Sequence, residues 1–205
     1  MYNKEMYKDF YLERERLLME LKQGLLSRRT INAFKKDPVE QSLIEDAIQA
    51  AIHAPNHKMT EPWHFYIFTE ETKKKVAARR ADLKAEKFVD QGSERAKEAW
   101  EKNYQFLVDL PWVIAVTTKR NEENLIRAKE DYAATAAAIQ NFMLSLWAHG
   151  VGVKWATGRM TQDEEMHHII GAKEDEELIG ILFIGYPEIV PKAKERQEKE
   201  VVTWV

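Results

Sequence analysis

Residues 132–153 read YAATAAAIQNFMLSLWAHGVGV, a run without a single Asp, Glu, Lys or Arg. The run is long enough for a membrane span, but polar side chains such as Gln140 and Asn141 are costly at mid-bilayer. The pattern instead predicts a helix buried almost all round inside protein. We expect Asp131 to cap its start and Gly150 to end it. Such a helix belongs at the centre of a fold or at a subunit interface.

The composition around this run is that of an ordinary globular domain. The chain has 205 residues, 31 Lys+Arg against 34 Asp+Glu, and a net charge of -3. We therefore expect one domain over residues 1–205 and no nucleic-acid partner, since such proteins usually carry a basic surplus. The absence of Cys excludes disulfides and thiolate ligands and fits a cytoplasmic location. Residues 1–10 lack the apolar core of a secretory signal, and no membrane span is expected.

Apolar periodicity predicts an α+β fold in which helices cover a sheet. A first helix is expected over residues 5–26, and residues 1–20 are taken as an N-terminal helical extension. Gly24 either ends this helix or starts a second short one. A second helix begins with Pro38 at its first position. The other expected helices span 38–52, 70–106 with a break at 91–93, 131–150 and a segment from Thr161; the expected strands span 63–68, 113–118, 151–155, 178–185 and 200–205.

Two adjacent arginines, Arg28 and Arg29, precede Thr30 and Asn32 in a predicted loop. Guanidinium groups bind phosphate oxygens in pairs of hydrogen bonds, and a threonine adds a hydroxyl donor. The segment is therefore a candidate phosphate site. The alternative is a solvated basic pair with no ligand.

Polar residues also crowd the loop that follows the second helix. His53 and His57 are four residues apart, the spacing of a two-histidine metal site on a helix. Pro55 lies between them and makes a regular helix there unfavourable, so we expect no metal. Asn56 and its neighbours are either ligand contacts or simple turn residues.

The segment GVGVKWATG, residues 150–158, follows the uncharged helix. It matches neither the dinucleotide-binding glycine pattern nor a P-loop. Its small residues would let a planar ligand approach the backbone, with Trp155 and Thr157 lining it, unless the segment is only a tight turn. The basic runs 73–75 and 79–80 are balanced by nearby acids and are expected to form a solvated face.

Taken in order, these segments resemble the nitroreductase family of FMN-dependent oxidoreductases, and most of all its small YdjA-like subgroup. The resemblance rests on five blocks of sequence and covers about residues 21–205. The blocks are SRRTINAF with DPV, AAIHAPNHK with PWHF, the uncharged helix with Gln140–Asn141, GVGVKW, and LIGILFIGYP.

The resemblance implies a three-layer fold with a mixed or antiparallel central sheet, and a homodimer with a tightly bound FMN at each interface site. NAD(P)H would donate hydride, and a nitroaromatic, quinone or related small-molecule oxidant would accept it by a ping-pong mechanism. Residues 200–205 would be a strand exchanged with the partner. The implied FMN contacts are Arg28, Arg29, Thr30, Asn32, Trp155, Ala156, Thr157, Gly158 and Arg196 from one chain, and His53, Asn56 and His57 from the other, with Lys192 and Lys194 as alternatives to Arg196.

Some positions depart from the family pattern. Asn32 stands where many members carry a cation near the flavin pyrimidine ring, and its neutral amide would make the flavin a poorer electron acceptor unless another cation substitutes. Asn56, Met59 and Glu61 also replace the usual residues. These departures favour, as an alternative, a flavin-binding or sensing protein with little turnover. Another flavin-dependent activity of the same family, such as flavin cleavage or dehalogenation, also stays open, as does a helical interaction protein without a cofactor.

Overall fold

A four-stranded sheet forms the centre of the protein. A computed structural model describes residues 21–196 and 201–205. The strands are β1 (Trp63–Ile67), β2 (Trp112–Lys119), β3 (Gly152–Ala156) and β4 (Glu176–Gly185), in the order β1-β2-β4-β3. Each neighbouring pair is antiparallel. The predicted α+β architecture is confirmed, with an antiparallel sheet.

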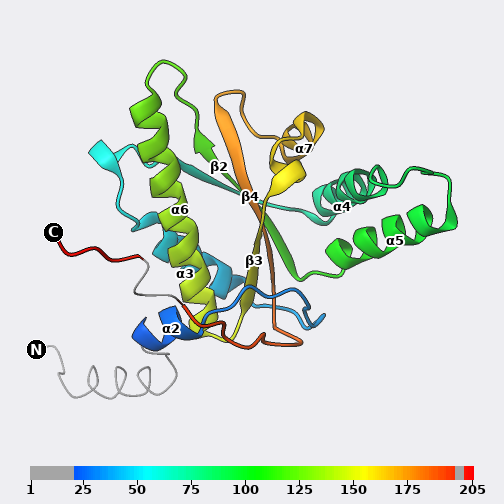
Figure 1. The fold of residues 1–205 in the computed structure, drawn as a ribbon, viewed down its shortest axis with the longest axis horizontal. Coiled ribbons are helices and arrows are strands. Elements are labelled where there is room, and N and C mark those ends of the chain that lie inside the picture. The colour runs from blue at the N-terminus through cyan, green and yellow to red at the C-terminus, as the bar shows by residue number, and fades with distance from the viewer. Residues whose placement is uncertain (1–20, 197–200) are drawn as a thin grey trace, which may run out of the picture.

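One face of the sheet is covered by α3 (Gln41–Ile52) and α6 (Leu125–Ala148), and α2 (Leu21–Ser27) packs beside α6 (Figure 1). Strand β2 contributes Ile114 and Val116 to this core, and α6 contributes Phe142 and Leu146. The short helix η1 (His57–Met59) lies on the same side and contacts α6. The alternation of side chains along each strand directs every second residue to this face.

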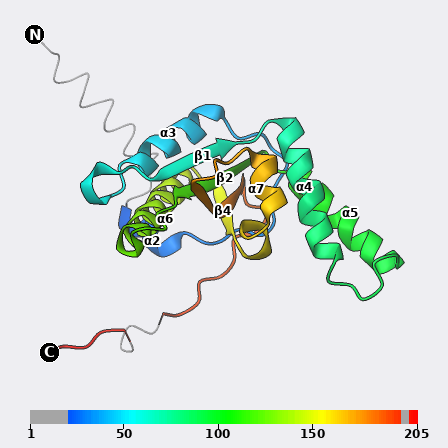
Figure 2. The same cartoon turned by 90° about the horizontal axis from the view of Figure 1, so that it is seen from above.

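The opposite face is covered by α4 (Glu70–Ala85), α7 (Glu164–Ile170) and the end of α5 (Glu94–Val108). The short helix η2 (Gly158–Thr161) follows β3 on this side. Figure 2 shows that α4 and α5 form an antiparallel pair that projects away from the sheet. The sheet therefore separates two hydrophobic cores that belong to different sets of helices.

The uncharged stretch forms most of α6, as predicted, and every residue from Ala134 to Ala148 is buried or half-buried. The predicted start is wrong. The helix begins at Leu125, where Asn124 caps it by accepting a hydrogen bond from the backbone of Arg127. Asp131 lies inside the helix, is 3% exposed and accepts a hydrogen bond from Thr60. Within the described residues, no helix has both the length and the apolar character to cross a membrane.

Three other predicted boundaries are also wrong. Pro38 does not start α3, because the preceding segment is extended and the carbonyl of Val39 accepts a hydrogen bond from the Trp112 indole. Gly24 does not end the first helix but lies buried within α2. The helix expected from Thr161 begins later, with Asp163 as its cap.

The predicted first helix is described only from residue 21 onward, so the proposed extension over residues 1–20 lies outside the described residues. Of the predicted strand 200–205, residues 201–205 are exposed and form no strand within this chain. Their exchange with a second copy stays a prediction.

Candidate functional site

The segment that carries the two arginines runs along the edge strand of the sheet. Thr30 pairs with Val153 in a parallel bridge, and the backbone N–H of Ile31 donates to the Val153 carbonyl at 3.3 Å. Gly152 makes this approach possible, because a Cβ there would lie 2.4 Å from Cγ1 of Ile31. The sequence suggested that small residues here let a ligand approach the backbone, but at Gly152 the space is filled by Ile31 of the same chain. Residues 28–32 and β3 form one continuous surface.

The guanidinium group of Arg28 lies near two other positive charges. Burial, and then the positive charges of Arg29 and Arg196, lower the pKa of Arg28. Arg29 donates to the carbonyls of Leu26 and Arg28, both at 2.8 Å, which fixes the direction of its side chain. None of the three arginines forms an ion pair within residues 21–196 and 201–205. Like charges held together without a counter-charge are what a phosphate-binding site requires.

The side chain of Asn32, predicted to lie near a flavin pyrimidine ring, accepts a hydrogen bond from Lys154 at 2.8 Å. Lys154 belongs to β3 and lines the adjacent pocket. The structure thus brings a cation to the position where the sequence departs from the family pattern. The sequence analysis did not single out this lysine as a cofactor contact. In the structure, Lys154 follows Val153, the residue of β3 that pairs with Thr30.

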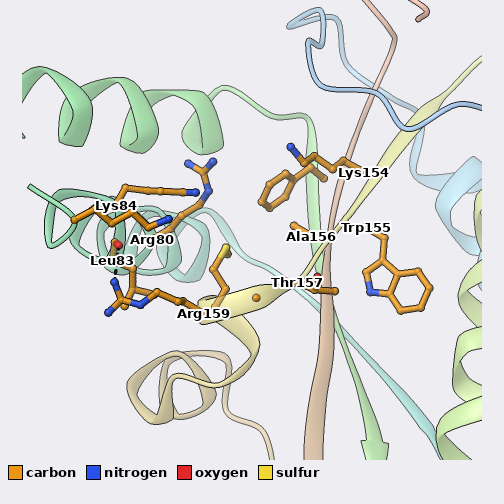
Figure 3. A pocket seen from close by; sticks show the side chains of 12 residues that line it. Arg80, Leu83, Lys84, Lys154, Trp155, Ala156, Thr157 and Arg159 are labelled. Carbon is orange, nitrogen blue, oxygen red and sulfur yellow. Dashed lines mark hydrogen bonds between the residues drawn. The ribbon is translucent and has the colours of Figure 1, made fainter. Parts of the chain in front are cut away.

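Beyond Lys154, the end of β3 lines a cavity of about 400 Å³ between the sheet and α4 (Figure 3). Ala156, Thr157 and Gly158, three of the predicted contacts, lie at this cavity. Gly158 has a φ of 87°, and a Cβ at this position would meet no atom within 4 Å. The backbone is therefore open on this side, which suits a planar ligand.

Trp155 also borders the cavity, but its indole points to the other side of β3 from Arg80 and Lys84 (Figure 3). Its ring lies over Gly180, where a Cβ would come within 2.0 Å of the indole nitrogen. The indole N–H donates to the carbonyl of Ile179 at 3.0 Å. The described position of Trp155 supports the strand rather than presenting the ring to the cavity.

Helix α4 forms the other wall of the cavity. Its residues Arg80, Leu83 and Lys84 face the end of β3, and Lys87 follows them just after the helix. The basic runs on this helix were expected to form a solvated face. That expectation holds for Lys75, which is exposed and pairs with Glu71. It is wrong for Lys73, which is 6% exposed and donates to the carbonyl of Leu110, and for Arg80, which is half-buried and lines the cavity.

The predicted loop residues lie elsewhere, on the face covered by α6. His57 Nδ1 is 2.8 Å from a carboxylate oxygen of Glu130, and the carbonyl of His57 accepts a hydrogen bond from Arg127. His53 Nδ1 instead contacts the backbone of Gln49 at 2.7 Å. The two histidines have separate partners, and no cluster of three metal-ligating side chains occurs among the described residues.

The same loop contains three non-glycine residues with left-handed backbone: Lys58, Met59 and Glu61 have φ values of 56°, 54° and 43°. The loop is held by the Thr60–Asp131 hydrogen bond and by Asn56, whose side-chain oxygen accepts from the backbone of Glu61 at 3.1 Å. Such strain persists where the surroundings fix it, and it is concentrated at functional sites. Met59 and Glu61 are also positions at which the sequence departs from the family pattern.

The predicted contact residues therefore fall into two groups, named the first and second half-sites. The first consists of the arginine segment, the end of β3 and α4. The second is the loop that contains His53, Asn56 and His57. In a single chain, α4 and the loop lie on opposite faces of the sheet, while the arginine segment runs along its β3 edge.

Comparisons with known proteins identify the family to which the chain belongs. Residues 25–186 match the sequence model of the Nitroreductase family. The protein "Putative NAD(P)H nitroreductase YfhC" of Bacillus subtilis (strain 168) is 33% identical over 177 residues, which cover 86% of this chain and 89% of that protein. The Escherichia coli (strain K12) protein YdjA, described in the same words, is 22% identical over 174 residues, which cover 83% of this chain and 90% of that protein.

Solved structures show the same fold. A nitroreductase-like family protein from Bacillus cereus superposes with a TM-score of 0.77 at 31% identity, over 91% of this chain and 96% of that one. The FMN- and NADPH-dependent nitroreductase NfnB from sphigopyxis sp. strain HMH superposes with a TM-score of 0.69 at 17% identity, over 91% and 99%. The family model spans most of the chain, and the chain belongs to the nitroreductase family.

Proposed function

We propose that this chain is an FMN-dependent oxidoreductase that acts as a homodimer, with each flavin held between the first half-site of one copy and the second half-site of the other. The observation that carries the proposal is that Arg28 lies near the positive charges of Arg29 and Arg196, in the segment that pairs with Val153 of β3. An FMN phosphate would supply the missing counter-charge, and its ring would extend toward Thr157 and Gly158. The flavin dependence of NfnB supports the choice of cofactor.

The residues fit such a group. The two arginines and Thr30 offer donors to a phosphate, and Asn32 with Lys154 offers polar contacts further along the same edge. The absence of a side chain at Gly158 leaves room for a ring against the backbone. The partner's second half-site would close the other side and exclude water. Tight binding follows if both halves contribute contacts.

Bound FMN would take up hydride from NAD(P)H and pass the electrons to a nitroaromatic, quinone or related acceptor. The chain has no dinucleotide-binding glycine pattern. We therefore propose that donor and acceptor use the same cavity in turn, and that no side chain acts as a nucleophile. The expected kinetic signature is a set of parallel double-reciprocal lines; intersecting lines would contradict the shared cavity.

The central test is the flavin content of the purified protein. We expect a yellow homodimer that releases FMN on denaturation, and an Arg28→Glu variant that stays folded but loses the flavin, because the phosphate would meet a carboxylate. Lys74→Glu changes the same charge at an exposed position of α4 and should retain the flavin. A colourless monomer that takes up no added FMN would refute the proposal.

The sensing alternative makes a different prediction from the same material. A flavin-loaded dimer that oxidises neither NADH nor NADPH with any acceptor would support a binding role. The contact between Lys154 and Asn32 favours turnover instead, because it brings a positive charge to a position where the sequence lacks one.

A further inference from the structure

The cavity between α4 and β3 contains more positive charge than a neutral reactant would need. Four cationic side chains line it: Arg80, Lys84, Lys87 and Lys154. A fifth, Arg159, is neutralised by an ion pair with Glu86.

These four cations have no acidic partner in any ion pair of residues 21–196 and 201–205. Other basic residues of α4 differ in this respect. Lys73 pairs with Glu70 at 2.8 Å, and Arg79 pairs with Asp163 at 2.6 Å. On one helix, therefore, several basic residues outside the cavity are paired, while those that line it are left without counter-charges.

The unpaired cations lie close enough to repel one another. Burial, and then the charges of Lys87, Arg80 and Lys154, lower the pKa of Lys84. Burial, followed by the charge of Arg80, lowers the pKa of Lys154. An anion placed among these groups would relieve the repulsion and favour their charged forms.

The strongest donor in the group is held in place before any ligand arrives. Arg80 donates to the carbonyl of Asn103 at 2.8 Å, and its guanidinium carbon lies 5.2 Å from the centre of the Phe106 ring and 5.6 Å from that of Phe183. Stacking on aromatic rings fixes the guanidinium plane. Arginine has five N–H donors, so others remain for a ligand.

Much of the remaining lining is apolar. Leu83, Ala156, Met160 and Phe183 belong to the core on this face of the sheet and border the cavity. The volume of about 400 Å³ lies within the range for small-molecule sites, roughly 300–1,000 Å³, and the flavin ring proposed against Thr157 and Gly158 occupies part of it, which leaves room only for a compact reactant. A compact ring that carries one acidic group matches this combination of size, apolar wall and positive charge.

We propose that the reactant entering this cavity carries a negatively charged carboxylate or phosphate group, and that Arg80, Lys84 and Lys87 receive it. The inference rests on the proposed function and adds the class of reactant. The charge can belong to the electron acceptor, as an aromatic carboxylate, or to the donor, as the additional phosphate of NADPH. Neither source requires a chemical step beyond the proposed hydride transfer.

The binding part of the inference is tested without turnover. Calorimetry on the purified protein should show that benzoate binds more tightly than the neutral isostere benzamide, and that salt weakens benzoate binding. The Lys84→Gln/Lys87→Gln double variant should bind benzoate about tenfold more weakly, as expected for the loss of roughly 1.4 kcal/mol of attraction. Lys74→Gln, an exposed lysine of the same helix, is the matched control.

The source of the charge is identified by kinetics. If the acceptor carries it, the ratio of kcat/KM for 4-nitrobenzoate to that for 4-nitrobenzamide falls about tenfold in the double variant. If the donor carries the charge, the ratio of kcat/KM for NADPH to that for NADH falls in the double variant instead. Either result supports the site and assigns its ligand.

Equal binding of benzoate and benzamide, together with unchanged ratios in the double variant, would overturn the inference. This result is distinguishable from failure of the proposed function. A protein without flavin or turnover would refute that function, whereas the calorimetric comparison would still report on the cavity itself.

Discussion

The two half-sites differ in how they are built. The first is rich in cations without acidic partners and has an open backbone at Gly158. The second is internally satisfied: His57 contacts Glu130, Thr60 donates to the buried Asp131, and the strained loop is fixed against α6. The first half-site needs a ligand to balance its charge, whereas the second is a rigid surface that needs none.

Under the proposed function, each chain contributes one half of a shared site, and this difference between the halves is what the proposal needs. A rigid, strained loop is useful where it must fit another body closely, and the loop faces away from the cations of its own chain. A second copy would join the two kinds of surface. The following predictions test that view, beginning with the largest expected effect.

Mixed dimers give the most direct test. An Arg28→Glu chain and an Asn56→Ala/His57→Ala chain should each lose flavin as homodimers. When the two are co-expressed, each heterodimer should regain one intact site, because both wild-type halves then meet at one interface. Flavin content of affinity-separated heterodimers measures this. Heterodimers as empty as the parents would show that the halves do not meet.

The second prediction concerns the C-terminal residues. Deleting residues 198–205 should weaken the dimer and release FMN, since these residues are predicted to pair with the partner's sheet. Size-exclusion chromatography and the visible spectrum check both effects. Unchanged elution volume and flavin content after the deletion would refute the strand exchange.

Gly152→Ala should damage the first half-site alone. The new Cβ would lie 2.4 Å from Ile31 and push residues 28–32 away from β3. Overpacking of this kind costs about 1–3 kcal/mol, which denaturant unfolding measures, and flavin affinity should fall as well. Gly92→Ala places its Cβ no closer than 3.4 Å to any atom and is the control.

Thr60→Val should loosen the second half-site. It leaves the buried carboxylate of Asp131 without its hydrogen bond from Thr60, at a cost of about 1–3 kcal/mol. We expect faster hydrogen exchange in the loop with little change around β3. If exchange in the loop stays as slow as in the wild type, another contact holds it.

The pH dependence of stability tests the ion pair between Arg79 of α4 and Asp163, the cap of α7. The hydrogen bond from Arg79 lowers the pKa of Asp163 below its ordinary 3.8, so the pair stabilises the fold above that value and loses its effect as the pH falls through the lowered pKa. Asp163→Asn should cost about 1–2 kcal/mol at neutral pH. The difference from the wild type should narrow in acid, and denaturant unfolding at several pH values checks this.

Much of the fold could be predicted because it depends on local patterns. The strands at Trp63, Val113 and Leu178 are short apolar runs, and each lies where alternation or continuous burial predicted it. The helix starts were less predictable. Charged residues before Asp131 concealed the first two turns of α6, and a tertiary contact from Trp112 keeps the segment around Val39 extended.

The candidate site could be predicted only in part. Arg28 and Thr30 stood out as a motif, and in the structure this segment runs beside β3, with Thr30 paired to Val153. The cations of α4 were missed because their sequence neighbours are acidic. A helical spacing was nevertheless present. Lys84 lies four residues after Arg80, and Lys87 lies seven residues after Arg80, which is the spacing of side chains on one helix face. Only the fold shows that this face borders a cavity.

The projecting pair of α4 and α5 has an evolutionary consequence. It borders the cavity but contains none of the residues proposed to hold the cofactor. Mutations along these two helices would therefore alter which molecules are admitted while leaving the redox machinery intact. Substitutions in this one helical hairpin would thus change the substrate range during evolution, and protein engineering for a new specificity would begin there.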